Sequence, residues 1–450
     1  MQPDAGCGRR SRPKPEGYSD RLLPAALTAL ALLAAAAAAP AADWPQWRGP
    51  DHTGVTPESS GHPSGWPPRR LWDTHAGIGC TSPILAGGRL YVMGWEGPAG
   101  VRANPMGQDL VWCLDARTGK RLWRRNYPCR YHSRQRAGDL GQYGGPSSTP
   151  TFDAETGYLY TLSTDGHLAC WNARADGRPV WGRNLYETFP VPEKPDVGRG
   201  RREYGYPQSP LLRGRTIVVE VGSSQGTVVA FDKRTGKPVW RSEATILAGH
   251  TSGPAPMTVA GTPCLATLAL RKVLVLRTDP GHVGETVGTA DWTTDFANNI
   301  ATPAAWKQFL VVTSNYNVSR TACFEVSLGG LKERWRVRDH AKVGSPVIYK
   351  GRVFLVNGSV MCLDLATGRR LWQGGRFGNG SCLVTAGDDR LIAFGEGRLV
   401  LIDAMADAYT ELGKAENLFR ATCYPHPAVA DGLVAVKDMK GHLVVLSLRK

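Results

Sequence analysis

Two stretches of the chain combine arginine, histidine and tyrosine at a density that could bind an acidic protein, an anionic polymer or an anionic ligand. Arginine presents a rigid fork of donors to carboxylates and phosphates, and tyrosine adds a broad contact surface. The candidate partner-binding residues are Arg130, His132, Arg134, Arg136, Tyr143, Arg199, Arg201, Arg202 and Tyr204. The same residues could instead form two solvated loops, and the sequence leaves both interpretations open.

Residue types that commonly catalyse reactions form no recognisable site. The ten histidines are scattered, with no His-x-x-x-His pair and no Cys/His group at metal-binding spacing. The net charge of +15 would attract anionic partners, but the basic residues mostly do not form runs. From the residues alone we assign no catalytic residue and no metal ligand, and we expect a protein or an anionic polymer as partner, without nucleic-acid binding.

The first 42 residues have the three zones of a secretory signal. Basic residues up to Arg21 precede an apolar run, Leu22–Ala39, which ends at the small residues Ala39-Pro40-Ala41. We therefore expect a signal peptide at 1–42 and export to the periplasm or beyond. If the signal stays uncleaved, it would anchor the chain in a membrane. No later apolar run approaches the length needed to span a membrane.

The elements that must position the candidate residues are short apolar strands around a recurring turn. The turn has the pattern Asp-x-x-Thr-Gly and is followed by a tryptophan at a fixed distance, at residues 113–123, 230–240 and 362–372. We expect the Asp to cap backbone donors, the Gly to adopt a positive φ, and the Trp to be buried. The motif residues, with weaker copies and one orphan tryptophan, are Asp115, Gly119, Trp123, Trp181, Asp232, Gly236, Trp240, Trp335, Asp364, Gly368, Trp372 and Trp72.

The repeats predict a closed ring of strands. Seven four-strand repeats can be placed between about Ser82 and Leu412, although the fourth has lost the turn signature and the seventh has no tryptophan. An eighth repeat ends after three strands, and Arg69–Asp73 resembles the missing fourth strand. We therefore predict an all-β, eight-bladed β-propeller of four-stranded antiparallel blades over 69–450, in which the N-terminal strand closes the last blade. Seven blades is the alternative. Residues 43–68 would form an extended strap, and we expect a monomer.

The repeated pattern resembles the tryptophan-docking motif of pyrroloquinoline-quinone (PQQ)-type, BamB-like propellers. Residues 230–240 match it throughout and 113–123 and 362–372 match it closely; the lead-in Asp43–Pro50 is similar to the start of secreted members. In the family the tryptophan packs between adjacent blades. In its dehydrogenase branch the resemblance would imply PQQ on the ring axis, a calcium ion and an Asp base. This chain lacks the adjacent Cys pair and the haem motif that such enzymes carry, and no ligand can be mapped.

The resemblance therefore favours an exported, non-catalytic scaffold that binds a protein or ligand, with no cofactor. The chain departs from BamB-type proteins in having no lipid-attachment cysteine after the apolar run. One alternative is a PQQ- and calcium-dependent quinoprotein dehydrogenase of alcohols or sugars. Another is a propeller that binds a carbohydrate or another polymer.

The longest connections predict where a partner would bind. In an up-and-down blade the connections between the second and third strands, and between successive blades, lie at the same end of the ring. The three long excursions, Trp95–Asp109, Asn126–Pro146 and Leu185–Pro207, are all of these two kinds. Loops of this length in a compact domain often carry function. We therefore expect the partner-binding residues on one face, over neighbouring blades.

Overall fold

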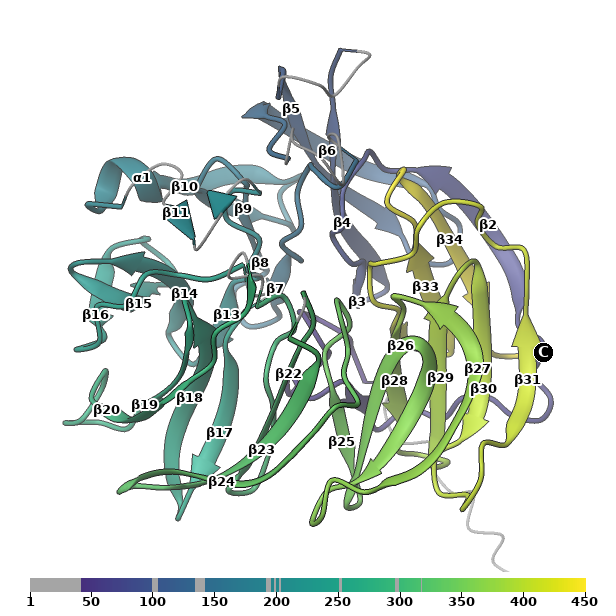
Figure 1. Cartoon of the computed structure of the whole chain (residues 1–450). Coiled ribbons are helices and arrows are strands. Elements are labelled where there is room, and N and C mark those ends of the chain that lie inside the picture. Colours follow the sequence, from purple (N-terminus) through teal and green to yellow (C-terminus); the bar gives the residue numbers. More distant parts are fainter. Residues whose placement is uncertain are drawn as a thin grey trace, which may run out of the picture. The chain divides into compact units, whose positions relative to one another are not determined.

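The computed structural model describes residues 42–98, 104–133, 142–191, 196–197, 200–201, 204–250, 253–295, 299–316 and 318–450. Their regular structure is almost all β, with one four-residue α-helix, α1 (Leu185–Thr188). Eight antiparallel sheets follow one another along the chain and form the blades of a propeller (Figure 1). The eight-bladed prediction is confirmed.

Blades 1 to 4 each use four consecutive strands. Blade 1 contains β3 (Ile84–Ala86), β4 (Arg89–Glu96), β5 (Met106–Asp115) and β6 (Arg121–Arg130). Blade 2 contains β7 (Thr151–Asp153), β8 (Tyr158–Leu162), β9 (His167–Asn172) and β10 (Arg178–Asn184). Two short strands, β11 (Asp196–Val197) and β12 (Gly200–Arg201), pair between blades 2 and 3. Blade 3 contains β13 (Leu211–Arg213), β14 (Thr216–Ser223), β15 (Gly226–Asp232) and β16 (Pro238–Arg241). Blade 4 contains β17 (Ala255–Val259), β18 (Thr262–Ala269), β19 (Lys272–Arg277) and β20 (Thr286–Asp291).

The later blades vary this plan. Blade 5 contains β21 (Ala304–Trp306), β22 (Phe309–Ser314), β23 (Arg320–Ser327) and β24 (Gly330–Val337). Blade 6 contains β25 (Val347–Tyr349), β26 (Arg352–Asp364) and β27 (Arg370–Gly378). The start of β26 pairs with β25 and its end with β27, so one long element takes two strand positions. Blade 7 contains β28 (Ser381–Thr385), β29 (Arg390–Gly395), β30 (Arg398–Asp403) and β31 (Glu411–Ala415), and β1 (Val55–Thr56) adds to it in parallel.

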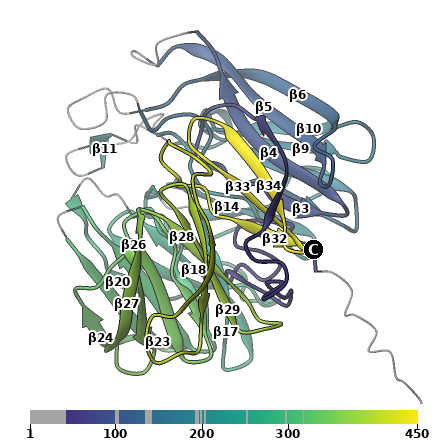
Figure 2. The same cartoon turned by 90° about the vertical axis from the view of Figure 1, so that its right-hand side faces the viewer.

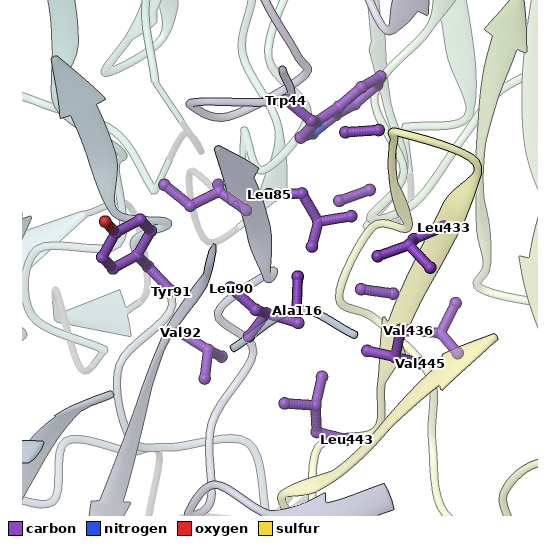
Figure 3. Packing of buried hydrophobic residues seen from close by; sticks show 14 of the residues in the cluster. Trp44, Leu85, Leu90, Tyr91, Val92, Ala116, Leu433, Val436, Leu443 and Val445 are labelled. Atoms are coloured by element: carbon purple, nitrogen blue, oxygen red, sulfur yellow. The ribbon is translucent and has the colours of Figure 1, made fainter. Parts of the chain in front are cut away.

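Blade 8 closes the ring as the sequence predicts. It contains β32 (Ala428–Ala430), β33 (Leu433–Lys437), β34 (His442–Ser447) and, as its fourth strand, β2 (Arg69–His75). The register of β2 on β34 runs from Arg69 opposite Ser447 to His75 opposite His442. Buried side chains of blades 8 and 1 pack together across this junction (Figure 3). Joining the two chain ends in one sheet leaves no open blade at the closure.

The tryptophans that follow the signature turns join neighbouring blades. In five of them the indole N–H donates to a backbone carbonyl in a turn of the next blade: Trp72–Ala116, Trp123–Ala173, Trp181–Lys233, Trp335–Leu365 and Trp372–Ala406. The signature glycine of the next blade lies under the ring. At Gly236, φ is 66° and an added Cβ would lie 2.6 Å from the Trp181 ring. Only glycine fits both the backbone conformation and this close approach.

The signature aspartates stabilise the turns themselves. Asp115 Oδ1 accepts from the Thr118 backbone N–H at 2.8 Å and from the Thr118 hydroxyl at 2.7 Å. Asp232 makes the same two contacts with Thr235 at 2.8 and 2.9 Å. Asp364 repeats them with Thr367. These carboxylates are committed to holding the turn.

The interface between blades 3 and 4 lacks this docking. Blade 4 has no signature turn, and Trp240 is only half-buried. A cavity of about 210 Å³ beside it is lined by residues that include Arg213, Cys264 and Thr278. The loss of the turn signature in the sequence therefore corresponds to looser packing here.

Residues 43–68 lie across the end of the ring that carries the signature turns, which we call the turn face. Trp44 pairs with Leu85 of blade 1, and the Trp47 indole N–H donates to the Thr302 hydroxyl beside blade 5 at 2.9 Å. β1 pairs with blade 7. Figure 2 shows this purple segment close to β3 and β32. Because it contacts blades on both sides of the ring, the strap covers the axis on this face.

A belt of hydrogen bonds links the residues that precede the first strands. In four places a backbone N–H donates to the side-chain hydroxyl at the same position in the next blade: His426 to Ser82, Ser82 to Thr149, Thr149 to Ser209 and Thr302 to Ser345, at 2.8–3.2 Å. These bonds satisfy buried donors where the strands converge.

Candidate functional site

The opposite end of the ring, which we call the loop face, carries the longest connections. They lie between β4 and β5, between β6 and β7, and between β10 and β13. The antiparallel strand order places all three at the same end of neighbouring blades. Part of what the sequence predicts as loop is strand instead: β4 extends to Glu96, β5 begins at Met106, and β6 continues to Arg130. The predicted boundaries Trp95–Asp109 and Asn126–Pro146 are therefore wrong at their ends.

The extended part of the β5–β6 hairpin forms an arm, residues 106–110 and 125–130, at the loop face (Figure 1). Its small core is Trp95, which is fully buried and donates from its indole N–H to the Cys129 carbonyl at 2.9 Å. The Tyr131 ring lies 4.9 Å from the Trp95 ring, centroid to centroid. This satellite cluster explains why the segment is ordered as a hairpin, because a two-stranded ribbon needs a packed face to be stable.

Arg130 and His132 are held by one carboxylate of blade 2. The Arg130 backbone N–H donates to Asp165 Oδ2 at 2.6 Å, and His132 Nε2 hydrogen-bonds Asp165 Oδ1. Burial raises the pKa of Asp165, but the bonds from His132 and Arg130 outweigh it and bring the pKa below its ordinary value. His132 is itself buried, whereas the Arg130 side chain is exposed. Arg130 is therefore available to a partner, and His132 holds the outer end of the arm against blade 2.

Tyr143 lies in a different part of the loop face. Its ring stacks on Tyr424 with 5.7 Å between centroids. Both rings line a cleft of about 380 Å³ at the loop-face ends of blades 6 and 7, beside the connection from blade 7 to blade 8, together with Phe377, Asn379, Glu396, Phe419 and Arg420. The Asn379 amide donates to the Tyr424 hydroxyl at 3.4 Å. Aromatic walls with a few polar groups are typical of a binding cleft.

The structure thus separates the residues that the sequence groups together. Arg130 and His132 lie at the arm, Tyr143 lies at the cleft, and the Tyr204 ring packs edge-on against His250 at 5.7 Å. Arg201 lies in the short strand β12. Arg134, Arg136, Arg199 and Arg202 fall outside the described residues.

Two features of this face are not recognisable as such from the sequence. Arg420, Phe377 and Phe419 of the cleft lie in blades without long insertions, so loop length does not identify them. Asp109 is fully buried in the arm, where Tyr127 donates to its Oδ2 at 3.3 Å. Burial raises the pKa of Asp109 to about 7, and the neighbouring Asp165 charge adds to the rise. An aspartate in the middle of an apolar strand is the signal that could have identified it.

The described residues offer little for covalent or metal chemistry. Residues 222–226 have the Gly-x-Ser-x-Gly spacing of a nucleophile elbow, but they form the hairpin between β14 and β15 rather than a strand-to-helix turn. Within the described ranges, no group of three or more His, Cys, Asp or Glu side chains could hold a metal ion. We derive no step through a calcium-assisted quinone site.

The described residues contain no helix that is long and apolar enough to cross a membrane.

Comparison with known proteins gives one family match and several structural neighbours. The family described as outer membrane protein assembly factor BamB matches residues 107–374. BamB from Moraxella catarrhalis is similar in structure, with a TM-score of 0.56 and 12% identity over 84% of this chain and 99% of that chain. Quinohemoprotein alcohol dehydrogenase from Comamonas testosteroni aligns with a TM-score of 0.59 and 13% identity over 91% of this chain and 81% of that chain. At these identities the likeness shows the fold alone.

One curated relative is a dehydrogenase. The dehydrogenase subunit of a quinone-type alcohol dehydrogenase from Komagataeibacter europaeus is 30% identical over 138 residues. This match covers 30% of the present chain and 17% of the relative, so it spans less than a fifth of that protein.

Proposed function

The chain belongs to the PQQ-like propeller family described as outer membrane protein assembly factor BamB, and from that premise we propose that it is a non-catalytic scaffold that binds a protein partner on its loop face. The observation that carries the proposal is the asymmetry of the two faces. The strap covers the turn face, whereas the loop face presents the arm and the aromatic cleft.

The arm and the cleft have the properties of a protein-docking surface. The arm is held by its own buried cluster, so its exposed residues are presented on a rigid support. Met106, at the outer end of the arm, is 52% exposed, and Arg130 is directly opposite it in the register. Arginine, methionine and aromatic residues are enriched at protein interfaces. A rigid platform also loses less conformational entropy of its own when a partner binds.

The charge of this surface favours an acidic segment of a partner protein. Arg130 and Arg420 are exposed at the arm and the cleft, and the whole chain has a net charge of +15. Opposite charge would speed encounter and select among partners. We propose that the chain performs this role after export, guided by a signal at residues 1–42, in the periplasm or outside the cell.

A second candidate function is a quinone-dependent dehydrogenase, and one observation favours it. The 138-residue match to a dehydrogenase subunit is more specific than a shared fold. The described residues supply no metal-ligand group, which is why we place this candidate second.

One titration distinguishes the two functions. Purified protein is mixed with PQQ and Ca²⁺, and binding is followed by quinone absorbance and thermal shift, then by dye-linked oxidation of alcohols and sugars. The scaffold proposal predicts neither saturable binding nor dye reduction. Tight binding with dye reduction would overturn it.

A further inference from the structure

The strap buries a positive charge at the axis of the ring. Arg48 is 2% exposed, and three of its hydrogen bonds are to backbone carbonyls: Thr53 at 2.9 Å, Pro346 at 2.5 Å and Thr302 at 3.4 Å. Its Nε has no hydrogen-bond partner in the described part of the chain. Among the same residues, no carboxylate forms an ion pair with Arg48, although a buried charge is costly without a counter-charge.

Other buried polar atoms near Arg48 also lack partners within the described ranges. His426 Nε2 and both ring nitrogens of His52 are buried without a hydrogen bond. The His426 ring lies 4.4 Å from the ring of Trp47, the residue before Arg48. Burial, and next the Arg48 charge, lower the pKa of both histidines to about 3. Each ring is therefore neutral at physiological pH and carries one N–H that can donate.

Blade 7 has a buried hydroxyl without a hydrogen-bond partner in the part of the chain that the structure describes, at the residue before Cys382. Ser381 occupies the belt position of its blade, but its Oγ has no hydrogen-bond partner among the described residues, whereas the equivalent Ser345 accepts from Thr302. The neighbouring Cys382 lies within the electrostatic reach of Arg48: burial raises the pKa of its thiol to about 12 and the Arg48 charge opposes the rise. Within that part of the chain, the belt therefore lacks its hydrogen bond at Ser381, in the blade whose Cys382 is affected by the Arg48 charge.

We propose that the ring axis holds a small monovalent anion of the halide class, bound by Arg48 Nε and by donors from Ser381, His426 and His52. The chemistry of the site selects for an anion, since its unpaired groups are a guanidinium, imidazole N–H groups and a hydroxyl, all of which can donate. A cation would find no carboxylate there among the described residues. The anion would neutralise Arg48 and connect the strap to blades 7 and 8. This proposal is independent of the partner that the loop face binds.

The test uses the full chain purified without chloride, with gluconate as the counter-anion. Sodium chloride or bromide replaces gluconate at constant ionic strength while the melting temperature is followed. We expect a saturable rise of a few degrees, because a ligand that binds only the folded state stabilises it. Crystals grown in bromide should show an anomalous peak within hydrogen-bond distance of Arg48 Nε.

Three variants make the test specific. Arg48→Met keeps the length of the side chain and removes the charge, so the chloride response should disappear. Ser381→Ala keeps the charge and should shift the chloride titration to higher concentration. Arg89→Met, which removes an arginine that donates to the Ala173 carbonyl in another interface, should keep the full response. If Arg48→Met does not fold, the chloride titration of Ser381→Ala and the bromide crystals of the parent still test whether an anion binds.

The proposal is overturned if Arg48→Met responds to chloride as the parent does, or if Ser381→Ala leaves the titration unchanged. It is also overturned if the density beside Arg48 in bromide crystals has no anomalous signal, which would assign ordered water to the site.

Discussion

The two faces of the propeller are stabilised in different ways. The turn face depends on short-range chemistry that recurs in most blades: an aspartate that holds its own turn, a glycine under a ring, and a tryptophan that donates to the next blade. The loop face depends on contacts that occur once, such as the Trp95 cluster under the arm and the Tyr143–Tyr424 stack at the cleft. The repeated turns therefore build the ring. The arm and the cleft, which occur once, are where this chain can differ from its relatives.

The largest expected effect comes from removing a docked tryptophan at the turn face. Trp123→Ala should lower the free energy of unfolding by about 3–5 kcal/mol, because a buried indole and its bond to Ala173 are both lost. Trp240→Ala is the matched control, since Trp240 is half-buried beside the blade 3–4 cavity, and it should cost about 1 kcal/mol. Chemical denaturation measures both. If the two variants lose the same free energy of unfolding, the docking of Trp123 against the next blade does not stabilise the ring.

A smaller effect separates close packing from backbone conformation. Gly236→Ala and Gly214→Ala both place a Cβ at positive φ in blade 3, but only the Cβ at residue 236 would meet the Trp181 ring. Gly236→Ala should therefore be less stable than Gly214→Ala by about 1–3 kcal/mol. Melting of the two variants side by side measures the difference. If they match, the glycine is required only for its turn.

Asp109 on the loop face should give stability a pH dependence opposite in direction to that of His52 and His426, whose lowered pKa values favour folding as the pH rises. The pKa of Asp109 is about 7 in the folded protein, against 3.8 for the free side chain, so folding favours the protonated acid. The contribution of Asp109 to the free energy of unfolding is therefore fully present below about pH 4. It declines as the pH rises toward 7, by at most about 1.4 kcal/mol per pH unit. Asp109→Asn should therefore show a weaker decline between pH 4.5 and 7.5. Denaturant unfolding across this range measures it, and parallel pH profiles for parent and variant would refute the assignment.

Exposed loop-face charges should have the smallest effect on stability. Arg130→Ser keeps the backbone bond to Asp165 and should change the free energy of unfolding by less than about 0.5 kcal/mol. Combined neutralisation of Arg130 and Arg420 should weaken partner binding while leaving the melting curve unchanged. Lys120 and Lys237, exposed on the turn face, provide the charge-matched control. If the loop-face variant keeps every interaction of the parent, the basic residues are a solvated surface.

Sequence and structure agree best where the structure is local. The turn signature lies within eleven residues, so Asp232, Gly236 and Trp240 identify a hairpin, and the orphan strand at Arg69–Asp73 identifies the ring closure. The arm could not be predicted, because its order depends on Trp95 packing against Cys129 and Tyr131, more than thirty residues away. The cleft could not be predicted either, since it joins blades 6 and 7 and the connection after blade 7 to Tyr143 from a distant connection.

Site-specific cross-linking can show directly whether a partner binds the loop face. A photo-reactive phenylalanine analogue is placed at Met106, Arg130 or Arg420 on the loop face, and at Lys120 or Lys237 on the turn face, in cells that export the chain. We expect the same partner protein to be cross-linked from the loop-face positions and from neither turn-face position. Adducts that form mainly from Lys120 and Lys237 would contradict it and would assign binding to the face that the strap covers.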